Sequence, residues 1–355
     1  MNSENDIVRG CLVGGAVGDA LGYAIEFLNE RQIFSQYGKK GITGYKFDKK
    51  TGKALISDDT QMSLFTASGM LVGSEHGMLY DIEQAYLDWL TTQYYTFDEA
   101  RNIAVRNSWL RDIPGLYSPR APGNTCLSAL KARAGSDEIP ESFIASKLNN
   151  SKGCGGVMRA APIGLLSAVS IEEADIIAAE AAAVTHSNSL GYMPAAVLAH
   201  IVYRIANSKD RASLKQIIID ARNTAKKLFS DDPYIKDLTG IIDLAVRLSE
   251  NKDDDLDNIH RLGEGWVGDE ALAISLYCSL RHQNDFSAGI IASVNHNGDS
   301  DSTGAVTGNI LGALCGYDAI EPRWKKELEL LDVILKAADD IAESRINYSN
   351  SIRLC

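Results

Sequence analysis

Apolar residues recur every three to four positions along most of the chain, the spacing of one buried face of an α-helix. No pair of segments shows the apolar–polar alternation of neighbouring β-strands. We therefore expect an all-α fold, with loops over 23–56 and 135–156. The expected helices span residues 5–22, 59–73, 81–92, 97–112, 124–134, 157–168, 171–185, 189–207, 211–228, 232–249, 268–281, 285–295, 303–315 and 322–345.

Two of the expected helices carry glycine at every fourth position, so that the glycines share one helix face. Each such glycine costs about 1 kcal/mol of helix stability relative to alanine, so a compensating close approach of backbones is expected. We expect these two helices deep in the core, packed against each other. The glycines are Gly10, Gly14, Gly18 and Gly22 in the first helix, and Gly304, Gly308, Gly312 and Gly316 in the second.

Composition narrows the class of protein. The 355 residues are 45% hydrophobic with no composition break, which predicts one domain over 1–355 with a sizeable core. A net charge of −12 without a basic run argues against nucleic-acid binding. The six cysteines form no CxxC pair, the N-terminus is polar, and no apolar run reaches the roughly 18 residues of a membrane span. We expect a cytoplasmic protein that does not bind membranes.

Two clusters of side-chain oxygens precede helices in the same manner. Ser57–Thr60 and Asp299–Thr303 each combine two carboxylates with hydroxyl groups. One such cluster alone would be read as a helix cap, which needs a single acceptor. Two clusters exceed that need, and together they could supply four carboxylates with no thiolate or imidazole. Such oxygens suit two Mg²⁺ or Mn²⁺ ions better than zinc.

Other segments offer weaker signals. Glu26 follows the first helix and could overhang a site, whereas Asp19 is expected to be a buried group that fixes a loop. The glycine-rich loop Gly153–Gly156 could present backbone N–H groups to a diphosphate. His186 lies between apolar helices, where a structural role is common, and Trp266 could stack on a base but is expected to pack in the core.

Taken together in this order, the motifs resemble the ADP-ribosylglycohydrolase family, especially the dinitrogenase reductase-activating glycohydrolase and ADP-ribosylarginine hydrolases. The resemblance covers about residues 8–330, with a C-terminal helix to about 345, and implies the orthogonal multi-helix bundle of that family. The matching segments are Gly18–Phe27, Ser57–Leu64, Gly123–Cys126, Gly155–Arg159, Thr185–His186 and Gly298–Gly304.

The resemblance also implies roles for particular residues. It implies a centre of two Mg²⁺ or Mn²⁺ ions that hold the ribose hydroxyls while water releases ADP-ribose from a protein arginine. The implied metal ligands are Ser57, Asp58, Asp59, Asp299, Asp301 and Ser302. The implied substrate-binding residues are Asn124, Gly153, Cys154, Gly155, Gly156, Val157, Met158 and His186. The candidate catalytic residues are Glu26, Asp59 and Asp301.

One position departs from the family pattern. Ala121 stands where the nitrogenase-regulating enzyme has a catalytic aspartate, three residues before the asparagine matched by Asn124. The general base is therefore left open between Asp59 or another metal-linked carboxylate and Glu26. The linkage is also open, since a serine-linked or other ADP-ribose derivative could be the substrate. A third possibility is an immunity protein that binds an ADP-ribosylating toxin.

Overall fold

The computed structural model describes residues 3–103, 105–136, 140–208 and 212–353, and side chains as far as residue 345. The described residues are largely helical and contain no strand longer than an isolated bridge, which confirms the all-α prediction. The longer helices are α1 (Glu4–Gly22), α2 (Glu30–Tyr37), α3 (Asp58–Gly69), α4 (Met78–Tyr94), α6 (Asn124–Ala134), α9 (Ile171–Ala183), α10 (Ser189–Asn207), α11 (Leu214–Leu228), α12 (Ile235–Ser249), α14 (Gly268–Arg281), α15 (Phe286–Val294), α16 (Ser300–Cys315) and α18 (Leu331–Arg353).

Short helices connect these elements. They are α5 (Phe97–Ala100), η1 (Trp109–Asp112), η2 (Pro114–Leu116), α7 (Phe143–Ser146), η3 (Cys154–Gly156), α8 (Ala161–Gly164), α13 (Asp255–His260) and α17 (Pro322–Lys325). Helix α2 falls in the segment expected to be a loop. Its capping box, in which Asn29 and Gln32 bond each other's backbone N–H groups, is a sequence signal that the apolar pattern does not include.

Three expected helices are wrong in extent. The 97–112 segment is two short helices, because buried Arg111 bonds the Ala100 carbonyl oxygen and folds the chain back. Only Ala161–Gly164 of the 157–168 segment is an α-helix, since the preceding Arg159 turns into the core. The helix expected over 322–345 is divided into α17 and α18.

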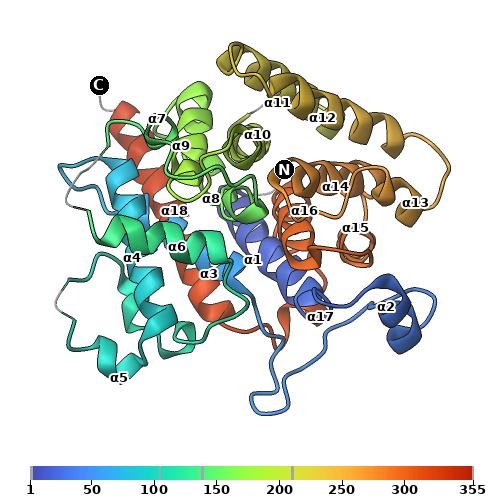
Figure 1. Cartoon of the computed structure of the whole chain (residues 1–355), viewed down its shortest axis with the longest axis horizontal. Coiled ribbons are helices and arrows are strands. Elements are labelled where there is room, and N and C mark those ends of the chain that lie inside the picture. Colours follow the sequence, from blue (N-terminus) through green and yellow to red (C-terminus); the bar gives the residue numbers. More distant parts are fainter. Residues whose placement is uncertain (1–2, 104, 137–139, 209–211, 354–355) are drawn as a thin grey trace.

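Helices α1 and α16 pack against each other in antiparallel directions through their glycine faces, near the centre of the molecule (Figure 1). A Cβ atom added at Gly18 would lie 1.9 Å from the Gly304 carbonyl oxygen, and one at Gly14 would lie 2.3 Å from the Gly308 oxygen. The glycines therefore allow backbone contact that no side chain would permit. The predicted pairing of the two helices is confirmed, and it brings the end of α1 to the start of α16.

Helix α3 is joined to α1 by a buried carboxylate. Asp19 accepts hydrogen bonds from the backbone N–H groups of Ser57 and Thr60, at 3.0 and 3.2 Å, and from the Thr60 hydroxyl group. Burial raises the pKa of Asp19 to about 6, although these bonds oppose the shift. The expected structural role of Asp19 is confirmed, and it fixes the start of α3 beside the end of α1.

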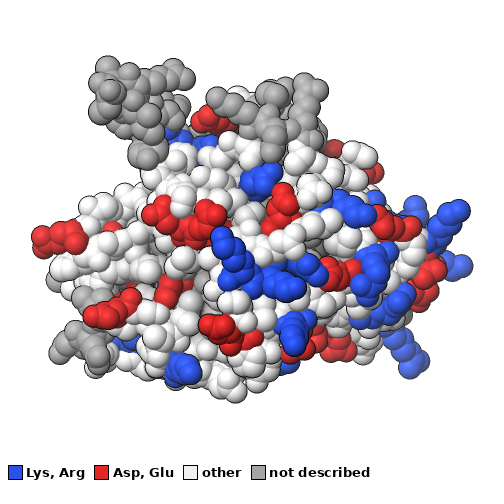
Figure 2. All heavy atoms as spheres, turned by 90° about the horizontal axis from the view of Figure 1, so that it is seen from above, with Lys and Arg blue, Asp and Glu red and all other residues white. Residues whose placement is uncertain are grey.

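Three further sequence expectations can be compared with the structure. The cysteines within the described residues are all free thiols. None of the described helices is long and apolar enough to cross a membrane. On the face shown in Figure 2, Lys and Arg side chains are interspersed with Asp and Glu side chains, although acidic residues outnumber basic ones in the whole sequence by 47 to 35.

Candidate metal centre and ligand cavity

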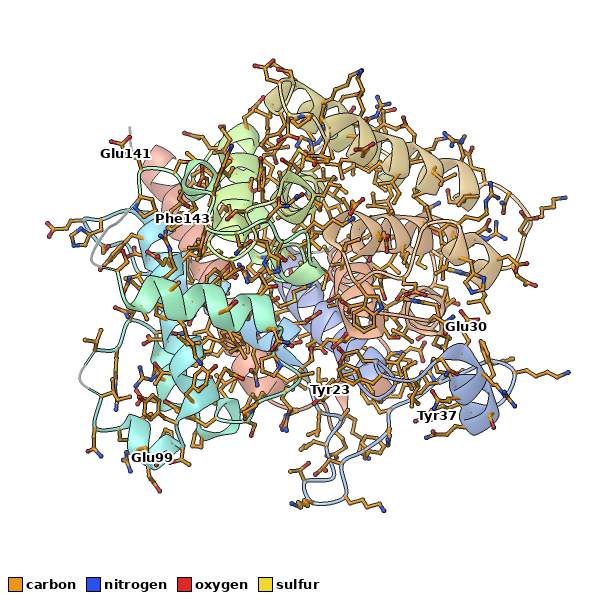
Figure 3. All side chains as sticks on the ribbon, in the orientation of Figure 1. Tyr23, Glu30, Tyr37, Glu99, Glu141 and Phe143 are labelled. Carbon is orange, nitrogen blue, oxygen red and sulfur yellow. The ribbon has the colours of Figure 1, made fainter. Side chains whose placement is uncertain are left out.

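Carboxylates from three parts of the fold line one cavity of about 210 Å³. They come from the turn after α1, the first turn of α3 and the start of α16. Tyr23 and Glu30, labelled in Figure 3, stand on either side of the short segment that carries Glu26. The two acidic clusters of the sequence therefore do meet. The lining carboxylates are Glu26, Asp58, Asp59, Asp299 and Asp301, and Ser302 lies with them.

Capping explains only part of this arrangement. The Ser57 hydroxyl accepts the Asp59 N–H at 3.1 Å, and Asp299 Oδ1 accepts the Ser302 N–H at 3.1 Å, so both helices have capped N-termini. Asp58, Asp59 and Asp301 are nevertheless almost completely buried beside one another. Ser57 is fully buried and is not among the residues that line the cavity.

Burial dominates the electrostatics of the cluster. It raises the pKa values of Asp58, Asp59 and Asp301 well above the ordinary aspartate value, and repulsion between neighbouring carboxylates adds to the shift. Burial and the charges of Asp299 and Asp58 raise the pKa of Glu26 to about 8. Without a cation, the cluster therefore retains protons at neutral pH. A bound divalent cation would offset the repulsion.

The donor atoms fit hard divalent cations. Asp59 Oδ2 and Glu26 Oε2 are buried with no hydrogen-bond partner in the described structure, as expected of oxygens that would bind a cation. Asp299 Oδ2 instead accepts the Cys154 thiol at 2.7 Å. In the described part of the chain, no group of three or more His, Cys, Asp or Glu side chains is arranged so that it could hold a metal ion. Binding would therefore require side-chain rearrangement within the cluster.

A glycine-rich loop forms another wall of the cavity, above His186. A Cβ atom added at Gly155 would lie 2.6 Å from His186 Cε1, so only glycine allows the loop to lie so close to the ring. Gly153, Cys154, Gly155, Met158 and His186 all line the cavity. Gly156 packs against α10 instead, and the Val157 side chain is fully buried, so neither is a lining residue.

The protonation of His186 is set from behind the cavity. The Arg159 guanidinium donates to the Thr185 hydroxyl oxygen at 2.6 Å, and this oxygen lies 2.8 Å from His186 Nδ1. Arginine only donates, so the Thr185 hydroxyl hydrogen goes to Nδ1 at 2.8 Å or to the Ala182 carbonyl oxygen at 3.5 Å; the shorter contact favours Nδ1, with the ring proton on Nε2. Burial and the Arg159 charge lower the pKa of His186 to about 3. His186 is thus a neutral polar group and not a proton shuttle at neutral pH.

Trp266 lies at the cavity with 42% of its surface exposed, so the prediction that it packs in the core is wrong. Its loop is held in two places. The Cys154 N–H donates to the Trp266 carbonyl oxygen at 3.3 Å, and the Asp299 N–H donates to the Glu264 oxygen at 2.9 Å. The loop thereby connects the glycine-rich wall to the α16 carboxylates and presents an indole ring at the opening.

The remaining lining residues come from the loop before α6. Asn124, an expected substrate-binding residue, begins this helix beside the cavity and is exposed. Ala121, whose φ is 54°, also lines the cavity. The lining residues that we did not predict from the sequence are Ala121, Gly123, Thr125, Cys126 and Trp266, of which Gly123–Cys126 belong to a segment that the sequence had already marked.

Comparisons with known proteins all point to the same protein family. A family model described as ADP-ribosylglycohydrolase matches residues 2–350. The ADP-ribosyl-[dinitrogen reductase] glycohydrolase of Rhodospirillum rubrum is 24% identical over 92% of each chain. The ADP-ribosylarginine hydrolase Tri1 of Serratia proteamaculans is 24% identical over 95% of this chain and 79% of its own. A solved ADP-ribosylglycohydrolase-related protein complex has a TM-score of 0.67 at 21% identity, covering 97% of this chain and 100% of its own.

Proposed function

Since the chain belongs to the ADP-ribosylglycohydrolase family, we propose that it hydrolyses the N-glycosidic bond between ADP-ribose and a protein arginine, with two Mg²⁺ or Mn²⁺ ions. The observation that carries this proposal is the convergence of carboxylates from the turn after α1, from α3 and from the start of α16 on one cavity. The family supports a hydrolase of ADP-ribose derivatives. The arginine linkage is supported by the name of one relative, the ADP-ribosylarginine hydrolase Tri1, which is 24% identical to this chain.

The metal ions would be held by the oxygens of the two acidic clusters. When bound, two such ions polarise vicinal hydroxyl groups and stabilise negative charge that develops on oxygen. The partnerless Asp59 Oδ2 and the all-oxygen character of the cluster support this assignment. The proposed ligands are Ser57, Asp58, Asp59, Asp299, Asp301 and Ser302.

Proton transfer falls to the carboxylates. The pKa of Glu26 is about 8 in the metal-free protein, and a Glu26 that keeps its proton when cations bind could deliver it to the departing arginine nitrogen. The attacking water must lose a proton, for which Asp59 or Asp301 is the candidate base, because Ala121 can accept none. If bound cations lower its pKa, Glu26 becomes a competing candidate for the base. His186 remains neutral in either case and serves as a hydrogen-bond donor.

The rest of the cavity suits the ADP portion of the substrate. The glycines of the Gly153–Gly155 loop bring backbone close to the cavity. The Gly153 and Cys154 N–H groups donate to the Ser151 hydroxyl and the Trp266 carbonyl oxygen, so a diphosphate would have to displace these acceptors or use the N–H groups that follow. His186 Nε2–H is a donor on the same wall. The Trp266 indole ring at the opening could stack on adenine.

The direct test uses peptides that carry ADP-ribose on arginine or on serine. We expect ADP-ribose release from the arginine peptide with Mg²⁺ or Mn²⁺, and none after EDTA treatment. The double variant Asp58→Ala/Asp301→Ala is the control and should be inactive. Release from only the serine peptide would reject the arginine linkage and keep the hydrolase. No metal-dependent release from either peptide would reject the proposed function.

A further inference from the structure

A carboxylate outside the cavity connects three segments that meet at the start of α3. Glu329 lies between α17 and α18, and its side chain is 13% exposed. Beside it the chain forms a short parallel bridge, in which the Ala54 N–H donates to the Glu327 oxygen at 2.8 Å and the Glu329 N–H donates to the Ala54 oxygen at 2.9 Å. The α17–α18 connection is therefore fixed to the segment that leads into Ser57.

The two oxygens of Glu329 hold different partners. Oε1 accepts the Arg120 guanidinium at 2.7 Å, and Oε2 accepts the Ile56 backbone N–H at 3.1 Å. Both partners are donors and lie at different oxygens of Glu329, so the carboxylate accepts from both in its present position. Since the Arg120–Glu329 pair is largely shielded from water, removal of either partner would leave the other charge uncompensated.

Both partners lead directly to Asp58. Ile56 precedes it by two residues, and the Arg120 carbonyl oxygen accepts the Asp58 N–H at 3.0 Å. The same loop returns to the carboxylate itself, because the Gly123 N–H donates to Asp58 Oδ2 at 3.3 Å. The direction of the Asp58 side chain thus depends on a loop that Glu329 holds.

The backbone around this junction is strained. Only four non-glycine residues in the described ranges have positive φ, and three of them flank the junction: Ala121 at 54°, Glu327 at 64° and Leu330 at 54°. Such conformations are unfavourable for residues with a Cβ atom and persist only where surrounding contacts impose them. The Glu329 contacts are well placed to impose them.

We propose that Glu329 is a positioning residue for the metal centre, which holds the start of α3 and the Arg120–Gly123 wall so that Asp58 and Asp59 face the cavity. The inference rests on the proposed function only in taking these aspartates as metal ligands. Groups that orient metal ligands from behind typically change metal affinity by about 10- to 100-fold when they are altered.

The test compares Glu329→Gln with Glu327→Gln. Glutamine keeps the shape of glutamate but has one acceptor oxygen, so either Ile56 or Arg120 must lose its partner at position 329. Glu327 lies two residues away and pairs with Lys53 at 2.9 Å near the surface, with 40% of its side chain exposed. It is the matched control, because its loss should leave the α3 start in place.

The readouts are Mn²⁺ affinity of the metal-free proteins, by titration calorimetry, and thermal unfolding without metal. We expect Glu329→Gln to bind Mn²⁺ about 10- to 100-fold more weakly, while Glu327→Gln binds as the unaltered protein does. Hydrolysis by Glu329→Gln should recover at saturating Mn²⁺. If Glu329→Gln does not fold, Arg120→Met removes one partner alone and should weaken Mn²⁺ binding in the same direction.

The outcomes separate the two proposals. Equal Mn²⁺ affinity of Glu329→Gln and the unaltered protein, with only a lower unfolding temperature, would leave Glu329 a structural residue and overturn the inference. An equal loss of affinity in both variants would also overturn it, since the effect would then come from charge alone. No Mn²⁺ binding by the unaltered protein would overturn the metal-dependent function, and the inference with it.

Discussion

The contact between α1 and α16 makes a quantitative prediction for Gly18→Ala. The new Cβ atom would lie 1.9 Å from the Gly304 carbonyl oxygen, whereas ordinary contact begins at 3.4 Å. The opposing backbone would have to retreat by about 1.5 Å. Overpacking of this kind lowers the free energy of unfolding by about 3 kcal/mol, the upper end of the usual range. Alanine returns about 1 kcal/mol of helix propensity. The net expectation is a loss of about 2 kcal/mol in the free energy of unfolding.

Denaturant unfolding of the metal-free protein measures this loss, and Gly240→Ala is the matched control. Gly240 lies in α12, is exposed, and has no atom within 4 Å of an added Cβ. That variant should gain up to about 1 kcal/mol from helix propensity alone. Because α1 and α16 also carry the site, Gly18→Ala should weaken Mn²⁺ binding as well. Equal stability of the two variants would refute the argument that backbone contact requires these glycines.

The other predictions concern the cavity itself. Asp301→Asn should lower Mn²⁺ affinity and hydrolysis by more than the roughly 100-fold typical of groups behind the ligands, checked by calorimetry and ADP-ribose release; retained affinity would exclude it as a ligand. Glu26→Ala should bind Mn²⁺ but hydrolyse more slowly or change linkage preference, and unchanged rates on both peptides would remove it from the mechanism. Raised carboxyl pKa values mean that the folded, metal-free protein holds protons that the unfolded chain has released above about pH 4. Its stability should therefore fall as the pH rises toward the Glu26 pKa of about 8. The stabilisation by Mn²⁺, followed as unfolding temperature, should be larger at pH 8 than at pH 6, and the opposite trend would contradict the assigned shifts. Trp266→Ala should weaken ADP-ribose binding by about 1–3 kcal/mol if the indole stacks on adenine, and unchanged affinity would exclude stacking.

Regular features of the fold could be predicted from the sequence because they depend on short-range periodicity. The glycine spacing of α1 and α16 indicated both their burial and their pairing, which the structure confirms. Two of the failures come from long-range contacts of buried arginines. Arg111 bonds Ala100 and divides one expected helix, and Arg159 turns inward to Thr185 and shortens another. No local sequence pattern predicts that a charged side chain will be buried against a partner that is distant in the sequence.

In the candidate site, too, local sequence patterns were predictive and long-range contacts were not. Adjacent oxygens before two helices were visible in the sequence, and the structure brings Asp58 and Asp301 to one cavity. The position of Trp266 was predicted wrongly because a tryptophan in a glycine-rich segment fits a core position and a surface position equally well. Glu329 gave no signal at all, since its role depends on a bridge between Ala54 and Leu328. Whether the clustered oxygens bind metal remains a prediction.

The antiparallel joining of α1 and α16 has a consequence during synthesis. Asp59 leaves the ribosome 240 residues before Asp299, so a nascent or prematurely terminated chain holds only part of the oxygen cluster. Such a fragment also lacks the partner for its glycine-faced first helix, which is a weak helix by itself. If the assembled cluster binds ions as proposed, their capture would begin only near the end of translation, and incomplete copies would neither compete for manganese nor hydrolyse the substrate.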